Sequence, residues 1–154
     1  MIQRIQSIFL LIATVLSAIM LFTPVSHIQS TTGETFTYFS YGFRNNDNTG
    51  NLISSALPVF ILLSVITLMT ILIIFLYKKR TLQMTLCKLT ILLVVLFVGL
   101  ICFNYIMIQK NHGSLSPSIF IIIIIPVLEI LALIFALRGI HKDELIVKSY
   151  DRLR

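Results

Sequence analysis

Four long apolar runs constrain this chain more than any other feature of its sequence. Each is long enough to cross a bilayer as a helix, because a helix rises about 1.5 Å per residue and the hydrocarbon core is about 30 Å thick. The runs cover residues 5–23, 57–77, 89–108 and 119–137. They predict an all-α membrane protein, a bundle of four transmembrane helices.

The composition excludes a soluble globular domain. Hydrophobic residues make up 57% of the 154 residues and charged residues only 12%, whereas about 25% of a soluble domain is charged. Helices that are apolar on every face must be covered by lipid or protein, so the bilayer is the expected surrounding. Only the connection 24–56 is longer than a short loop. We therefore expect a single membrane domain over residues 1–154, ending in the tail 138–154.

The basic residues predict the orientation. If the runs alternate in direction, ten of the twelve Lys and Arg residues lie on one side, and only Arg44 and Lys110 lie on the other. Lys and Arg concentrate in cytoplasmic segments. Both termini and the loop 78–88 are therefore expected in the cytoplasm, and the basic clusters are interpreted as topology anchors, with no nucleic acid as partner. The first run is longer than a signal-peptide core and lacks a small-residue cleavage site, so it is expected to remain as a span.

Residues 24–56 predict a small extracytoplasmic β-hairpin between the first two helices. A turn signal at residues 31–33 separates Val25–Ser30 from the aromatic stretch Thr35–Phe43. The aromatic–polar alternation changes phase within that stretch, which suggests a β-bulge in one strand. Asn45–Asn51 is expected to be a loop. An isolated hairpin is marginal, so it should pack on the helix ends or in the interfacial belt; an exposed edge for strand addition is the alternative.

Glu129 is the most informative polar residue, because it falls near the middle of the fourth run. A charge at that depth costs several kcal/mol, so the side chain should face the bundle as a neutral carboxyl group. Thr14, Thr67 and Thr70 lie at similar depth and are the expected hydrogen-bond partners. Interhelical bonding is the favoured role of Glu129; a proton or cation path is the alternative.

The remaining patterns predict packing rather than chemistry. The pairs Ala13/Ser17, Thr14/Ala18 and Ala132/Ala136 have the small-x-x-x-small spacing of closely packed membrane helices. No nucleophile–base pairing, phosphate loop or metal-ligand spacing is present. We expect a protein that is not an enzyme and that has no cofactor and no metal.

The tail after residue 137 differs from the rest of the chain because acidic and basic residues alternate in it. Glu144 and Lys148 have the spacing of a helical ion pair, and the segment is expected to form a helix on the inner surface or against another protein. Mixed charge suits a protein surface better than an anionic bilayer. The partner-binding candidates are Lys142, Asp143, Glu144, Lys148, Asp151, Arg152 and Arg154.

The two ends of the chain resemble a known family. The opening Met1–Gln6 and the tail resemble the four-span membrane proteins of Bacteroidota in domain-of-unknown-function family 4293. The tail residues that fit the family pattern are Lys142, Asp143, Glu144, Val147, Ser149 and Asp151–Arg154, and His141 stands where Arg is usual. The resemblance implies a bacterial inner-membrane location and supplies no activity.

Two functions fit these patterns. The favoured hypothesis is a non-enzymatic accessory or assembly subunit of a membrane complex, which binds a protein partner through the tail or the outer hairpin. The alternative is a small channel or proton-coupled transporter that uses Glu129. A copurifying partner would support the first hypothesis, and a continuous polar path through the bundle would support the second.

Overall fold

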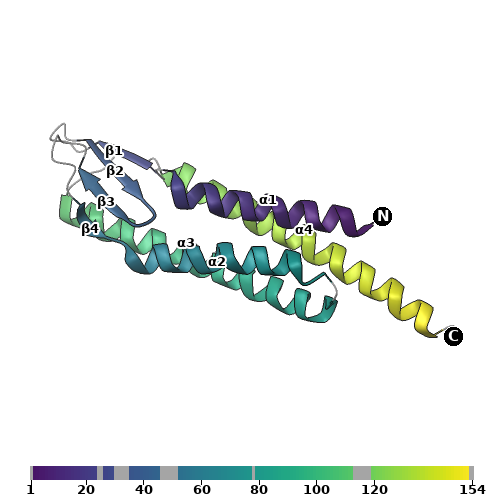
Figure 1. Ribbon diagram of the computed structural model, residues 1–154. Helices are drawn as coiled ribbons and strands as arrows, with labels where there is room; N and C mark the ends of the chain where they lie inside the picture. The colour runs from purple at the N-terminus through teal and green to yellow at the C-terminus, as the bar shows by residue number, and fades with distance from the viewer. Residues whose placement is uncertain are drawn as a thin grey trace.

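Four helices and a four-stranded sheet form the molecule. The computed structural model describes residues 2–23, 26–29, 35–45, 52–77, 79–112 and 119–152. The helices are α1 (Ile2–Phe22), α2 (Leu57–Phe75), α3 (Arg80–His112) and α4 (Ile119–Arg152); the strands β1 (Ser26–Gln29), β2 (Thr35–Phe39), β3 (Gly42–Asn45) and β4 (Leu52–Ser55) connect α1 to α2. Both termini lie at one end of the bundle, the terminal end, and the sheet lies at the other, the sheet end (Figure 1).

The helices run up and down in turn, and each packs on two neighbours. α1 packs against α2 and α4, and α3 packs against the same two helices. The contact between α1 and α4 is the most extensive, although these helices are the first and the last in the chain. The four helices therefore close a ring around a common core.

Buried side chains on three of the helices recur at intervals of three and four residues. This spacing is typical of helices that cross at about 20° in left-handed bundles. The buried stripes contain Gln6, Leu10, Ala13, Ser17 and Met20 on α1; Gln83, Cys87, Thr90, Val94, Phe97 and Ile101 on α3; and Pro126, Glu129, Leu133, Ala136, Ile140 and Asp143 on α4. Ala132 is buried beside this last stripe. The predicted small pairs Ala13/Ser17 and Ala132/Ala136 therefore face the core.

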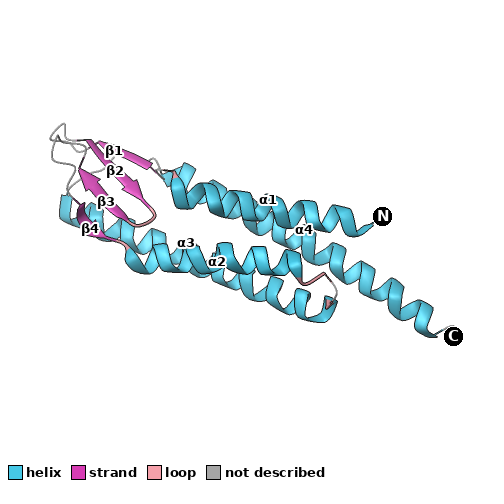
Figure 2. Cartoon of the chain, in the orientation of Figure 1, coloured by secondary structure: helices cyan, strands magenta, loops and turns pink. Residues whose placement is uncertain are grey.

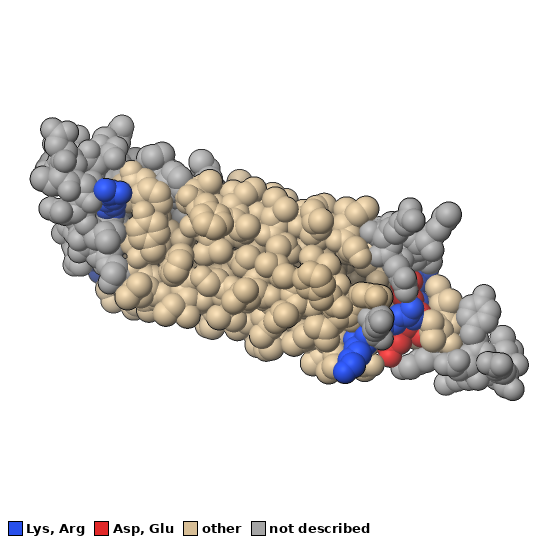
Figure 3. Space-filling view, viewed as in Figure 1, with Lys and Arg blue, Asp and Glu red and all other residues tan. Residues whose placement is uncertain are grey.

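The outer surface of the bundle is apolar. Large exposed hydrophobic side chains, among them Leu11, Leu68, Leu92 and Leu131, are found on all four helices, and on the face shown in Figure 3 the Lys, Arg, Asp and Glu side chains gather at the two ends. Within the described residues, α2, residues 80–104 of α3 and residues 123–147 of α4 are long and apolar enough to span a membrane. α1 contributes a shorter apolar stretch. The protein is therefore membrane-embedded.

The connection between α1 and α2 contains more strands than the sequence predicted. The strands pair antiparallel in the order β1-β2-β3-β4 (Figure 2). The predicted single strand Thr35–Phe43 folds back at Ser40 and Tyr41, where Phe39 pairs with Gly42. The change of phase in the aromatic pattern is thus a two-residue turn and not a bulge. A register shift does occur, but between Phe43 and Arg44 against β4.

The sheet is attached to the helix ends by side chains and by backbone. Tyr38 is buried and belongs to the same core as the helices. Ser40 donates a hydrogen bond from Oγ to the carbonyl oxygen of Leu21 (3.3 Å), and the backbone N–H of Ala56 donates to Tyr41 (3.0 Å). The rings of Phe39 and Tyr41 stack at 5.0 Å. The predicted turn at 31–33 and residues 46–51 of the predicted loop lie outside the described residues.

Two helices extend past the apolar runs that predicted them. α3 begins at Arg80 and not near Leu89, and α4 continues through Gly139 to Arg152. Polar residues end a membrane run but not a helix, because Lys, Arg, Gln and Glu are good helix formers. The predicted loop 78–88 is therefore mostly helix, and the tail is the last part of α4 rather than a separate helix on the inner surface.

Candidate functional site

Glu129 lies in the centre of the bundle core. Its side chain is fully buried in the α4 stripe, and neither carboxyl oxygen has a hydrogen-bond partner among the described residues. A buried polar group without a partner costs free energy that a satisfied one does not. Such groups therefore mark places where function or an additional ligand has to be considered.

The predicted hydrogen bonds from threonine to Glu129 are not made. Thr14 donates to the carbonyl oxygen of Leu10 (2.9 Å), Thr67 to that of Leu63 (2.9 Å) and Thr70 to that of Thr67 (2.8 Å). A hydroxyl has one proton to donate, and each of these protons serves the threonine's own helix. Membrane helices use this back-bonding widely, which explains why matching depth alone did not predict a partner.

Glu129 nevertheless belongs to a polar layer, which we define as Glu129, Ser17, Thr67 and Thr90. Cys87 of α3 donates a long hydrogen bond from Sγ to Leu133 of α4 (3.5 Å), which sets the register of these antiparallel helices. Along the helix axes, Thr90 lies about 4.5 Å from Cys87 and Glu129 about 6 Å from Leu133, both towards the sheet end. The ring contact between Phe9 and Phe135 on α1 and α4 (5.4 Å) places Ser17 within one turn of the same level.

α2 reaches this level as well. The side-chain amide of Gln83 donates to the carbonyl oxygen of Ile73 (3.1 Å), and Thr67 lies about 9 Å from Ile73 towards the sheet end. Thr70 follows about one turn closer to the terminal end. Every helix thus contributes a buried hydroxyl or carboxyl group near one depth. Ser17 and Thr90 were not predicted from the sequence as members of this layer. Their spacing of four residues from Ala13 and three residues from Cys87 places them on the same helix faces and could have indicated their burial.

The described buried polar side chains divide the bundle into two halves. From the polar layer to the terminal end they include Thr70, Gln83, Gln6 and Asp143. From the polar layer to the sheet end the described buried side chains of the helices are apolar; they include Met20, Val59, Leu63, Val94, Phe97 and Ile101. The described side chains therefore form no continuous polar path from end to end.

The predicted partner-binding residues are not all on one surface. Asp143 is buried, and its carbonyl oxygen accepts a hydrogen bond from Nη1 of Arg80 (3.3 Å); it is therefore part of the bundle and not a contact for another protein. Lys142 is exposed and Glu144 is half-buried. Lys148, Asp151 and Arg152 lie on the described helix without described side chains, and Arg154 lies outside the described residues.

Past Asp143, α4 extends beyond the terminal ends of the other helices (Figure 1). Leu145, Ile146 and Val147 are exposed there, about 12 Å or more past Leu137, where the apolar run ends. Contiguous exposed apolar side chains are a feature of binding surfaces, and the stretch of α4 that is apolar enough to span a membrane includes these three residues. We call residues 145–152 the projecting segment.

The fold and these sites define a class: a small membrane-embedded helical bundle with an antiparallel sheet at one end and a buried polar layer. The chain belongs to the family described as a domain of unknown function (DUF4293), whose model matches residues 2–153. No match was found among curated proteins. Among the residues that the structure describes, no three His, Cys, Asp or Glu side chains form a group that could hold a metal ion.

Proposed function

We propose that this protein is a four-span inner-membrane protein and a non-enzymatic accessory or assembly subunit, with both termini in the cytoplasm. The exposed apolar side chains of α1, which include Ile8, Ile12 and Phe22, support the fourth span. The 10:2 distribution of Lys and Arg supports the orientation. The sheet then caps the extracytoplasmic ends of the helices.

The projecting segment of α4 carries this proposal. It exposes Leu145, Ile146 and Val147 at the end of α4 that extends past the other helices. Charged residues flank this apolar patch on the same helix, as they do in the rim of a protein interface. A helix end that exposes apolar side chains between charged ones fits a hydrophobic groove on another subunit.

Site-specific photo-crosslinking in intact cells tests the proposal. A photoreactive residue in place of Leu145 should give a discrete protein adduct that can be identified by mass spectrometry. The same residue in place of Leu131, which is exposed on α4 within the apolar belt, is the matched control and should react with lipid. Only lipid adducts from both positions would refute the proposed partner-binding role.

A pair of charge variants separates a partner surface from a membrane anchor. Lysine at positions 145 and 147 keeps the attraction of the helix to an anionic bilayer but removes its apolar contact surface. The double variant Leu145→Lys/Val147→Lys should therefore lose the adduct or the copurifying complex and stay in the membrane. Lys79→Gln, at an exposed residue of the same end of the bundle, is the control and should retain the complex.

A second function, proton or cation movement through Glu129, is favoured by the unpartnered carboxyl group. Liposomes that contain the reconstituted full chain and a pH-sensitive dye would report proton flux. If Glu129 only stabilises packing, Glu129→Gln should fold normally and behave like the wild type, whereas Glu129→Lys should impair folding because it places an ammonium group at mid-bilayer. A proton flux that is lost in Glu129→Gln and kept in Thr14→Val would instead support transport.

A further inference from the structure

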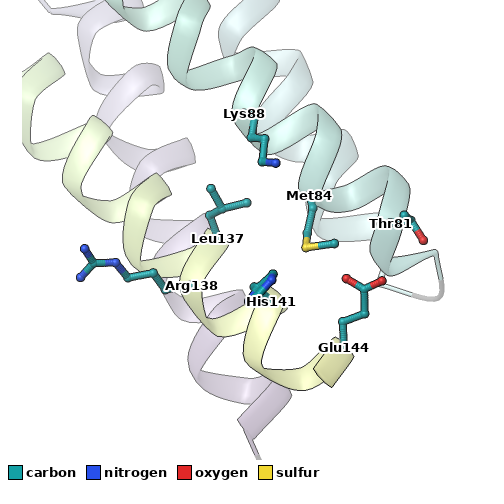
Figure 4. A pocket seen from close by; sticks show the side chains of 7 residues that line it. All are labelled: Thr81, Met84, Lys88, Leu137, Arg138, His141 and Glu144. Carbon is teal, nitrogen blue, oxygen red and sulfur yellow. The ribbon is translucent and has the colours of Figure 1, made fainter. Parts of the chain in front are cut away.

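A cleft opens between α3 and α4 at the terminal end of the apolar belt. Its volume is about 640 Å³, within the range of small-molecule sites. Leu137 and Met84 give its walls an apolar part, and Lys88, His141 and Glu144 give them charged or ionisable groups (Figure 4). None of these groups belongs to the polar layer or to the projecting segment.

The polar groups of the cleft follow a definite order along the helix axes. Lys88 lies deepest, next to Leu89 at the start of the apolar run, and its ammonium group points into the opening between the helices (Figure 4). His141 comes next, one turn past Leu137, and Glu144 lies nearest the terminal end. From membrane to water the order is therefore the apolar run beyond Lys88, the ammonium of Lys88, the apolar Leu137 and Met84, the imidazole of His141 and the carboxylate of Glu144. Arg138 contributes its stem, while its guanidinium group points to the other side of α4 (Figure 4).

We propose that this cleft binds the head group of an aminophospholipid, a lipid with a phosphate followed by a terminal ammonium group. In such a lipid the acyl chains, the phosphate and the ammonium follow one another from membrane to water, which is the order of complementary groups in the cleft. Lys88 and the imidazole N–H of His141 bind the phosphate, and the Glu144 carboxylate binds the ammonium. The acyl chains lie along the exposed Leu89 and Leu92 of α3 and Leu131 of α4.

The charge of the cleft favours this lipid over one that is only anionic. A purely anionic head group would satisfy Lys88 but would bring no positive charge to the Glu144 carboxylate, which repels negative charge. Basic pockets at the cytoplasmic ends of membrane helices are known to hold lipid phosphates. The carboxylate at the water side of this cleft is what adds selectivity for an amine.

Native mass spectrometry of the full-length protein in mild detergent tests this binding with three lipids of matched acyl chains. Phosphatidylethanolamine has a phosphate and a hydrogen-bonding ammonium, phosphatidylcholine has a quaternary amine without N–H donors, and phosphatidylglycerol has no amine. We expect phosphatidylethanolamine to bind at least about tenfold more tightly than the other two, as the loss of a charge-assisted hydrogen bond implies.

Substitutions then assign each charge. Lys88→Gln should weaken all three lipids alike, because they share the phosphate, and Glu144→Gln should abolish the preference for phosphatidylethanolamine without weakening phosphatidylglycerol. Lys142→Gln, an exposed residue outside the cleft, is the control and should change nothing. A thermal unfolding scan of each variant checks that it is folded.

Two results would overturn the proposal. Tighter binding of phosphatidylglycerol than of phosphatidylethanolamine would make the cleft an anionic-lipid site. Equal binding of all lipids by the wild type and by Lys88→Gln would show that Lys88 only extends to the membrane surface.

Discussion

Gly139 allows α4 to approach Gln6 of α1. A Cβ atom on Gly139 would lie 2.7 Å from Cγ of the buried Gln6, whereas a Cβ atom on Gly99 of α3 would meet nothing within 4 Å. Ala is favoured over Gly in a helix by about 0.5–1 kcal/mol. We therefore expect Gly99→Ala to raise the thermal unfolding temperature in detergent and Gly139→Ala to lower it, because overpacking costs about 1–3 kcal/mol.

The double variant Gln6→Ala/Gly139→Ala serves as the control for this contact. Shortening Gln6 removes the Cγ atom that the new methyl group would meet. The double variant should therefore lose less stability than the sum of the losses in the two single variants. Equal melting temperatures for Gly99→Ala and Gly139→Ala would contradict the close approach.

Tyr38 is the buried tyrosine that anchors the sheet, and burial raises its pKa to about 12. Its hydroxyl group has no hydrogen-bond partner among the described residues. In the unfolded chain the phenol loses its proton near pH 10. The folded state therefore holds this proton at higher pH, and its stabilising effect is complete below about pH 10 and is lost as the pH rises through 12.

Thermal unfolding of Tyr38→Phe and wild type from pH 8 to pH 12 measures this effect. The wild type should lose roughly 2–3 kcal/mol more than the variant over the range. At pH 8 the variant should be no less stable, since Phe removes a buried hydroxyl group that lacks a described partner. Parallel pH profiles for the two proteins would show that Tyr38 ionises as an exposed tyrosine does.

At the scale of the elements, α4 joins a packed part to a projecting part. Ile140 is fully buried, and the backbone of Asp143 accepts a hydrogen bond from Arg80. Truncation after Gly139 removes both contacts and should therefore lower the free energy of unfolding by at least about 2 kcal/mol. Truncation after Val147 keeps both contacts and should leave stability nearly unchanged; melting curves of the two truncated proteins in one detergent make the comparison.

This division changes the interpretation of the tail. The sequence predicted that the tail after residue 137 forms a helix on the inner surface or against another protein, because its charges make it unlike a membrane span. The charges do not prevent Ile140 and Asp143 from continuing the three–four spacing of the buried stripe. Equal stability of both truncated proteins would restore the simpler view of the tail as one separate element.

For the whole molecule, the charge asymmetry predicts a defined topology. A reporter fused after Arg154 should be active only in the cytoplasm, and one inserted near Asn46 only outside it, because Lys and Arg residues are retained on the cytoplasmic side. Paired enzymes that are active in opposite compartments provide the measurement. Activity of both fusions on the same side would show an even number of spans between these positions and would exclude the four-span arrangement.

The amino-acid sequence by itself determined that the protein is membrane-embedded, that it has four helices and that it belongs to its family. Long apolar runs need no tertiary partner to be recognised, since their length and hydrophobicity are local properties. Family membership follows from the match between the family model and the sequence of residues 2–153. The burial of Glu129 was likewise predictable from its depth alone.

Only the tertiary structure decided which faces meet. α2 is apolar on every face, so its hydrophobic pattern does not predict that Thr67 and Thr70 are buried. Their burial depends on the helices that pack against α2. The Ser40–Tyr41 turn contains neither Gly nor Pro, and pairing with β4 is a long-range contact that local pattern does not encode. Helix register decides three features: the unpartnered carboxyl group of Glu129, the cleft beside Lys88 and the projecting end of α4. Side-chain packing sets that register, and the apolar runs leave it undetermined.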